Sequence, residues 1–101
     1  MTKKQQFLSE SAKIRKLARS ENLILKSNPH ADEEMAKDNI FLADRMRVLK
    51  SGYVVKVENH TFELRYNMEG LDCDSGPICL VVEMFEMQHT LSIVTGWRIK
   101  K

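Results

Sequence analysis

Two arginines in the second half of the chain, Arg65 and Arg98, are the first residues whose type and spacing suggest chemistry. Each lies in a segment, residues 61–66 and 91–100, where apolar and polar residues alternate as in a strand with one buried face. The alternation predicts that both arginines are exposed. A guanidinium group can donate two parallel hydrogen bonds to one phosphate. The pattern therefore predicts either a phosphate clamp on a sheet or salt bridges with nearby glutamates, namely Glu58, Glu63 and Glu83.

Two aromatic residues, Tyr66 and Trp97, belong to the same segments but fall on their apolar phase. Aromatic rings can stack on nucleobases, yet this phase favours packing in the core. Two histidines, His60 and His89, fall where the alternation stops. We interpret both as exposed residues of turns rather than as catalysts.

The sequence contains no glycine-rich phosphate loop, no nucleophile elbow and no paired-carboxylate motif. Its two cysteines, Cys73 and Cys79, are six positions apart, a spacing that does not match zinc sites. The spacing allows a hairpin disulfide, whereas a reducing compartment would keep both as thiols. We therefore expect no metal, no cofactor and cysteines with a structural role.

The N-terminal segment predicts an amphipathic helix over residues 5–22, with a basic face formed by Arg15, Lys16 and Arg19. Residues 1–28 hold seven Lys/Arg and two Glu, a local charge of +5. The other 73 residues hold nine basic and twelve acidic groups, a local charge of −3. The basic face is either a solvated helix surface or one that binds RNA phosphates or an acidic protein.

The middle of the chain predicts two short helices, over residues 31–37 and 41–50. Pro29 suits the start of the first, and Gly52 is placed to end the second. Residues 23–25 are too few to extend the first helix and can form a brief strand.

After Gly52 the period changes from about 3.6 residues to 2, which predicts four strands and leaves Lys100 on the same exposed phase as Arg98. Helices followed by a strand meander predict an α+β fold, with N-terminal helices on one face of a four-stranded antiparallel sheet. We expect one domain over residues 1–101, comprising a basic helix (1–22), short helices (23–52) and the sheet (53–101).

The composition is that of a globular protein, with 43% apolar and 30% charged residues. No stretch approaches the roughly 18 apolar residues of a membrane span, and no long apolar run follows the N-terminal lysines. We therefore expect a cytoplasmic protein without a signal peptide and without a membrane partner.

Several short motifs resemble a bacterial domain family of unknown function, over roughly residues 23–99. That family has a His-Ala-x-x-x-Met helix, an Ile-x-x-x-Asp helix, a Leu-x-x-Gly stop and a final Val-Thr-x-Trp strand. The corresponding residues here are His30, Ala31 and Met35, then Ile40 and Asp44, then Leu49 and Gly52, and finally Val94, Thr95 and Trp97.

The family is grouped with RelE/ParE-like toxins, whose fold places two helices against a four-stranded antiparallel sheet. The resemblance implies a metal-independent endoribonuclease held inactive by an antitoxin partner, with RNA or the ribosome as target, although other members of the group poison gyrase. His30 matches the family histidine at a helix start, where the helix dipole favours a neutral imidazole suited to act as a base; a local capping or packing role is the alternative. The family often has arginine where this chain has Glu34 and Asp38.

Two hypotheses follow. The first is a toxin-like ribonuclease in which His30, Arg65 and Arg98 provide acid–base catalysis and charge stabilisation. In it, RNA is held by Arg15, Lys16, Arg19 and Lys100. The second is a non-catalytic module of the same fold that binds a partner protein. The acidic replacements and the −3 charge of residues 29–101 favour the second.

Overall fold

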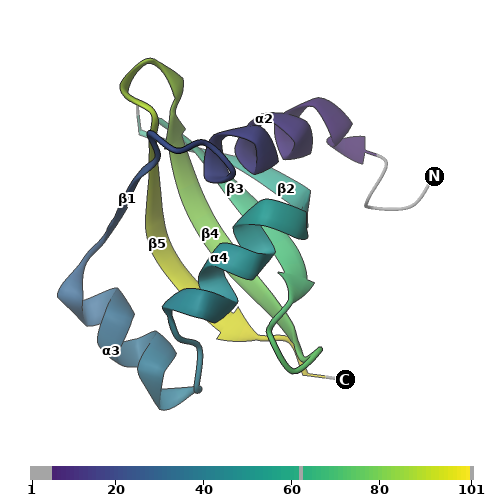
Figure 1. The fold of residues 1–101 in the computed structure, drawn as a ribbon, viewed down its shortest axis with the longest axis vertical. Helices are drawn as coiled ribbons and strands as arrows, with labels where there is room; N and C mark the ends of the chain where they lie inside the picture. The colour runs from purple at the N-terminus through teal and green to yellow at the C-terminus, as the bar shows by residue number, and fades with distance from the viewer. Residues whose placement is uncertain (1–5, 62, 101) are drawn as a thin grey trace.

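The computed structural model describes residues 6–61 and 63–100 (Figure 1). The N-terminal end of the expected first helix and the place of Phe62 in its strand lie outside the described residues. The elements in chain order are α2 (Leu8–Ala18), β1 (Ile24–Ser27), α3 (Pro29–Lys37), α4 (Leu42–Ser51), β2 (Tyr53–His60), β3 (Glu63–Leu71), β4 (Pro77–Phe85), the 3-10 turn η1 (Glu86–Gln88) and β5 (Thr90–Arg98).

The strands form one five-stranded sheet in the order β1-β5-β4-β3-β2. Strands β2 to β5 make an antiparallel meander, and β1 pairs with β5 in parallel, with Ile24 opposite Thr90. The α+β class is confirmed, but the expected four-stranded, purely antiparallel sheet is wrong. The short apolar segment before Pro29 becomes a fifth strand because the chain returns through α3, α4 and the meander to place β5 beside it.

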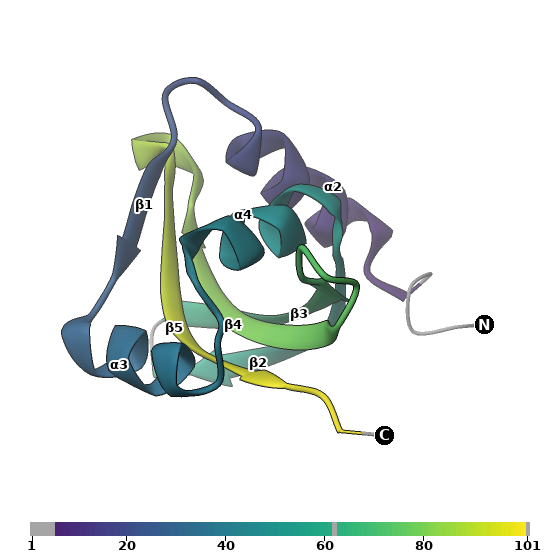
Figure 2. The same ribbon diagram turned by 60° about the horizontal axis from the view of Figure 1, so that its bottom comes forward.

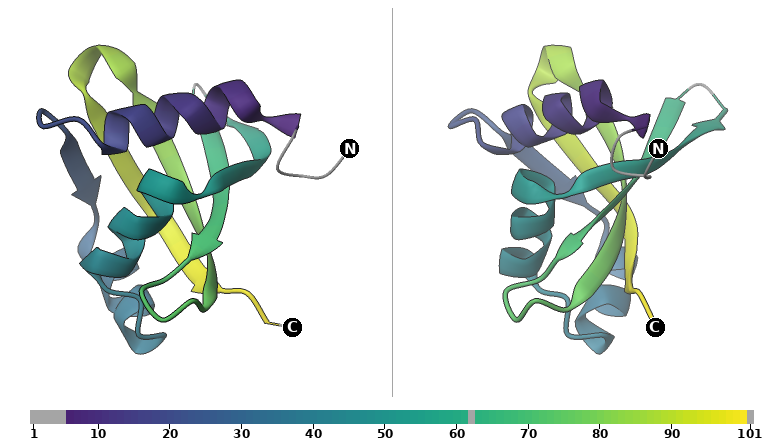
Figure 3. Two further views of the ribbon diagram at one scale, coloured as in Figure 1. Left: turned by 45° about the vertical axis from the view of Figure 1, so that its right-hand side comes forward. Right: turned by 90° about the vertical axis from the view of Figure 1, so that its right-hand side faces the viewer.

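The helices lie on one side of the sheet, and the sheet curls around α4 (Figures 2 and 3). The buried core lies between these layers. Its largest fully buried side chains come from helices, from the α3–α4 connection and from the sheet, and include Ile14, Met35, Ile40, Leu49, Met68, Leu80, Leu91 and Ile93. We call the opposite side of the sheet the helix-free face. No described helix is long and apolar enough to cross a membrane.

Local signals explain where the two central helices begin. The Asn28 side chain accepts a hydrogen bond from the Ala31 amide at 2.7 Å, and Pro29 occupies the first turn of α3. At α4, the Asp44 carboxylate accepts a hydrogen bond from the Phe41 amide at 3.0 Å. The predicted break before α3 and the end of α4 at Gly52 are both confirmed.

A β-bulge in β5 decides which side chains reach each face. Val81 pairs with Thr95 whereas its neighbour Val82 pairs with Ile93, so Val94 is an extra residue on β5. One extra residue inverts the alternation beyond it. Before the bulge Ile93 points into the core, as expected. After it, the apolar phase of β5 turns to the helix-free face and the polar phase turns toward the helices.

Candidate functional site

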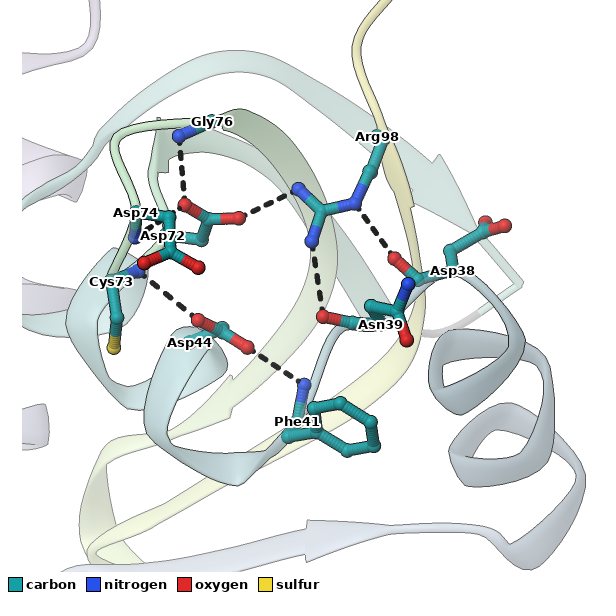
Figure 4. Close-up of polar contacts among 9 residues, drawn as sticks. All are labelled: Asp38, Asn39, Phe41, Asp44, Asp72, Cys73, Asp74, Gly76 and Arg98. Atoms are coloured by element: carbon teal, nitrogen blue, oxygen red, sulfur yellow. Dashed lines mark hydrogen bonds and ion pairs between the residues drawn. The ribbon is translucent and has the colours of Figure 1, made fainter.

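Arg98, predicted on the exposed side of the sheet, lies on the helix side as a consequence of the bulge. It pairs with Ile78, which is fully buried in the core. Its guanidinium donates hydrogen bonds to the backbone carbonyls of Asp38 at 2.7 Å and Asn39 at 3.0 Å, and to the Asp72 carboxylate at 2.6 Å (Figure 4). Arg98 therefore joins the end of β5, the C-terminus of α3 and the β3–β4 loop.

The Asp72 carboxylate is the acceptor around which the β3–β4 loop is folded. Its side chain is only 3% exposed, and it also accepts hydrogen bonds from the amides of Asp74 at 2.8 Å and Gly76 at 2.7 Å. The hydrogen bond from Arg98, followed by those from Gly76 and Asp74, holds the pKa of the Asp72 carboxyl below its ordinary value. Both carboxylate oxygens of Asp72 already accept hydrogen bonds within the protein, so the ion pair with Arg98 has a structural role.

Asp44 fixes the same loop to α4. One carboxylate oxygen accepts the Phe41 amide, and the other accepts the Cys73 amide at 3.0 Å. The Phe41 hydrogen bond and then the Cys73 hydrogen bond lower the pKa of the Asp44 carboxyl. A polar hollow of about 580 Å³ remains between this loop and Phe41, lined chiefly by groups that already bond to one another.

Arg65 lies on the helix-free face, where it faces Glu58 on β2. Its Nε donates to the Glu83 carboxylate at 3.3 Å, and both side chains are partly buried, 29% and 14% exposed. Arg65 therefore forms a salt bridge on the sheet surface, which was one of the two predicted alternatives, and is not a free phosphate clamp.

Arg65 and Arg98 thus project from opposite faces of one sheet, because Arg65 neighbours the core residue Tyr66 in β3 whereas Arg98 shares the core side with Ile78. A single phosphate cannot contact both. His30, exposed in the first turn of α3, is a third separate location. The three predicted catalytic residues are not brought together.

The basic face of α2 also differs from the expectation of a free surface. Arg15 donates to the Gly52 carbonyl at 2.9 Å and lies over the Tyr53 ring, 4.8 Å from its centroid. Arg19 donates to the Lys50 carbonyl at 2.6 Å. Both therefore satisfy carbonyls at the C-terminus of α4, where positive charge is favoured by the helix dipole.

The other basic candidates are exposed but separate. Lys16, on α2, lies in a shallow hollow with Lys13, Glu86 and His89, where Lys13 and Glu86 are 3.7 Å apart. Lys100 follows the end of β5. The four residues predicted to bind RNA do not form one continuous basic surface.

The structure agrees with the predictions for Tyr66 and His89 but not with the prediction for Trp97. Tyr66 is buried in the core, as its phase indicated, and burial raises the pKa of its hydroxyl. Trp97 is instead 41% exposed on the helix-free face, because it lies beyond the bulge. His89 is exposed beside η1, as predicted, with φ at 50°. The side chain of His60 lies outside the described part of the structure.

Both cysteines are free thiols: Cys73 is exposed and Cys79 is buried. Burial raises the pKa of Cys79 to about 11, and desolvation together with Asp44 raises that of Cys73. Neither has the lowered pKa of a nucleophilic cysteine. Within residues 6–61 and 63–100, no group of three or more His, Cys, Asp or Glu side chains is arranged to hold a metal ion.

The helix-free face carries an apolar patch at the end where β5 finishes. We call it the apolar rim, formed by Leu71, Pro77, Trp97 and Ile99. Leu71 pairs with Pro77, and the Ile99 amide donates to the Pro77 carbonyl at 3.0 Å, so three of the four lie in one row across the sheet. Leu71 is 49% exposed. A groove of about 430 Å³ runs from this row to the C-terminal turn of α4, where Arg47 and Ser51 line it.

Sequence reasoning missed the apolar rim. It assigned Trp97 and Ile99 to the core because it extended the alternation of β5 without a break. Gly96 was the available signal, since a glycine within a strand often marks a bulge or a close approach. A Cβ at Gly96 would lie 2.9 Å from the Met35 sulfur and 2.6 Å from Leu80, so this position accepts only glycine without repacking.

Comparisons with protein-family models, with curated proteins and with solved structures found no match to this chain.

Proposed function

We propose that this protein is a non-catalytic protein-binding module whose partner docks on the apolar rim of the helix-free face. The observation that carries the proposal is that Trp97 and Leu71, 41% and 49% exposed, lie with Pro77 and Ile99 on the same face of the sheet, at one end of strands β3, β4 and β5. Exposed tryptophan beside apolar residues on a rigid sheet is typical of the anchor positions of protein interfaces.

The charges favour a protein over RNA as the partner. The described side chains of the helix-free face carry three positive and four negative charges, a balance of −1: Lys26, Lys56 and Arg65 against Glu58, Glu63, Glu69 and Glu83. Two ion pairs, Lys56–Glu58 at 3.0 Å and Arg65–Glu83 at 3.3 Å, already use much of this charge. RNA affinity depends on unpaired cations that neutralise phosphates.

A relationship to the RelE/ParE group remains part of the proposal. From α3 to β5, the chain runs through two helices and then four antiparallel strands, the order that the family resemblance implies. A small protein encoded by a neighbouring gene, in the manner of an antitoxin, is then the first partner to test. The endoribonuclease alternative requires His30, Arg65 and Arg98 around one phosphate, and their separate locations weigh against it.

The test combines binding with an RNA control. The chain is co-expressed with the product of the adjacent gene, and the amount that co-purifies is compared between the native chain and Trp97→Lys. Met87→Lys is the matched control, because Met87 is an exposed apolar residue of the β4–β5 turn, at the opposite end of these two strands from the rim. We expect Trp97→Lys to abolish co-purification and Met87→Lys to retain it.

The same preparation is incubated with RNA, with and without ribosomes, and we expect the RNA to stay intact. Cleavage that is lost in Arg65→Ala or His30→Ala would overturn the proposal in favour of the nuclease. Co-purification that is unchanged in Trp97→Lys would show that the apolar rim is not the docking surface.

A further inference from the structure

The groove beside the apolar rim is lined by strand backbone that pairs with a neighbouring strand on one side only. Strand β2 begins with Tyr53 opposite Glu69, whereas β3 continues for two more residues, Gly70 and Leu71, that pair only with β4. Both of these residues line the groove. No described strand pairs with this side of β3 beyond Glu69, and since Gly52 and Val48 pack against Gly70, the backbone that is left open to the groove is that of Leu71.

The direction of the backbone groups follows from the hairpin. The Asp72 amide donates across the β3–β4 loop to the Gly76 carbonyl at 2.8 Å. In an antiparallel ladder the amide and carbonyl of successive residues point alternately to the two neighbouring strands. The Leu71 amide and carbonyl must then point away from β4, toward the outer edge that the groove follows.

The groove has an apolar floor and a cationic end. Leu71, Pro77 and Ile99 provide the floor. Arg47 is exposed, and its guanidinium makes no hydrogen bond or ion pair with any described residue. Lys100 follows directly after Ile99 and is also exposed. Glu69 is the one acidic side chain among the residues that line the groove.

We infer that this groove binds an extended, apolar and acidic segment of a partner protein, which adds a short strand to β3 at Leu71. The inference rests on the proposed function and specifies its ligand. Backbone hydrogen bonds to the Leu71 edge hold the segment, an apolar side chain covers the Leu71–Ile99 floor, and a carboxylate pairs with Arg47. This division of roles is that of strand addition, in which backbone pairing gives affinity and side-chain pockets give specificity.

The remaining sheet edges are poorer templates for strand addition. β2 has a bulge at Val55 and carries the charged pair Lys56 and Glu58, and β1 is only four residues long. Bulges, charges and short length are the usual protections of an edge strand. The Leu71 edge is also short, but Gly70 and Leu71 carry no charge and no bulge, and the edge opens onto an apolar surface.

The probe is a synthetic pentapeptide of alternating valine and glutamate, titrated into the full chain labelled with ¹⁵N and followed by amide chemical shifts. Two matched peptides are used: one with lysine in place of glutamate, and one with the central amide N-methylated so that it cannot donate. We expect saturable shifts at Gly70, Leu71 and Tyr53 for the acidic peptide alone. Arg47→Gln should weaken its binding about fivefold, the effect of one charge-assisted hydrogen bond. Lys26→Gln, at the far side of the sheet, should leave it unchanged.

Absence of shifts at millimolar acidic peptide would overturn the inference, as would equal shifts with the N-methylated or the lysine peptide. These outcomes are distinct from failure of the proposed function. If capture of a partner depends on Trp97 but not on Arg47, the protein is a binding module as proposed, but its ligand is not an extended strand in this groove.

Discussion

Arg98 and Asp72 form an ion pair at 2.6 Å that joins β5 to the β3–β4 loop, with the Asp72 side chain only 3% exposed. The other donors of Arg98 satisfy carbonyls at the C-terminus of α3, as Arg15 and Arg19 do at the C-terminus of α4. Three of the arginines expected to meet RNA thus share one structural role: each places positive charge at the negative end of a helix.

Breaking this ion pair should destabilise the fold. Asp72→Asn and Arg98→Gln each leave a partly or fully buried charge without its partner, so we expect each to lower the free energy of unfolding by about 2–4 kcal/mol. In a double-mutant cycle followed by urea unfolding, the double variant should lose clearly less than the sum of the two. Additive losses would show that the two side chains do not interact in solution.

Acid should remove the contribution of the same carboxylate. Because the folded state holds the pKa of the Asp72 carboxyl below the ordinary value of 3.8, folding favours its ionised form. Its stabilising effect is therefore complete above that value and is lost as the pH falls through the folded-state pKa. Asp32 and Asp44 also have lowered pKa values and change stability in the same direction.

We therefore expect the free energy of unfolding to decrease progressively below about pH 5. Asp72→Asn should make this dependence shallower, because the variant has one fewer proton to take up. Asp74→Asn is the control, since the Asp74 carboxylate accepts no hydrogen bond from a described residue. An unaltered pH dependence in Asp72→Asn would contradict the assignment.

The sequence was informative where local signals determine structure. Asn28 and Pro29 predicted the start of α3, and the change of period at Gly52 separated helices from strands. It failed at β5, because the extra residue Val94 inverts the alternation and exchanges the faces of Trp97 and Arg98. It also failed for Arg15, whose partner Gly52 is 37 positions away. Both errors concern tertiary pairing, which periodicity within one segment does not encode.

Ser11 connects α2 to the sheet and offers a test of how that helix is attached. Its fully buried hydroxyl donates to the Phe7 carbonyl at 2.7 Å and accepts from the Val54 amide at 2.8 Å. Ser11→Ala leaves the Val54 amide without a partner, so we expect a loss of about 1–3 kcal/mol. Ser9→Ala, on the exposed side of α2, should change stability by less than about 0.5 kcal/mol. Equal effects of the two variants in thermal unfolding would mean that α2 is not docked through Ser11.

The two thiols should differ in reactivity, because one is exposed and the other lies beneath the helix-free face. Cys79 is 3% exposed and burial raises its pKa to about 11, so at pH 8 it is both inaccessible and protonated. Cys73 is exposed, but its pKa is also raised, by desolvation and by Asp44.

Since only the thiolate reacts, a disulfide reagent should modify one thiol per native chain, more slowly than it modifies free cysteine. Denaturant should release the second, and Cys73→Ser should abolish labelling of the native protein. Rapid modification of both thiols without denaturant would show that β4 separates from its neighbours, and the face that carries the apolar rim would then not be the rigid surface on which the binding proposal depends.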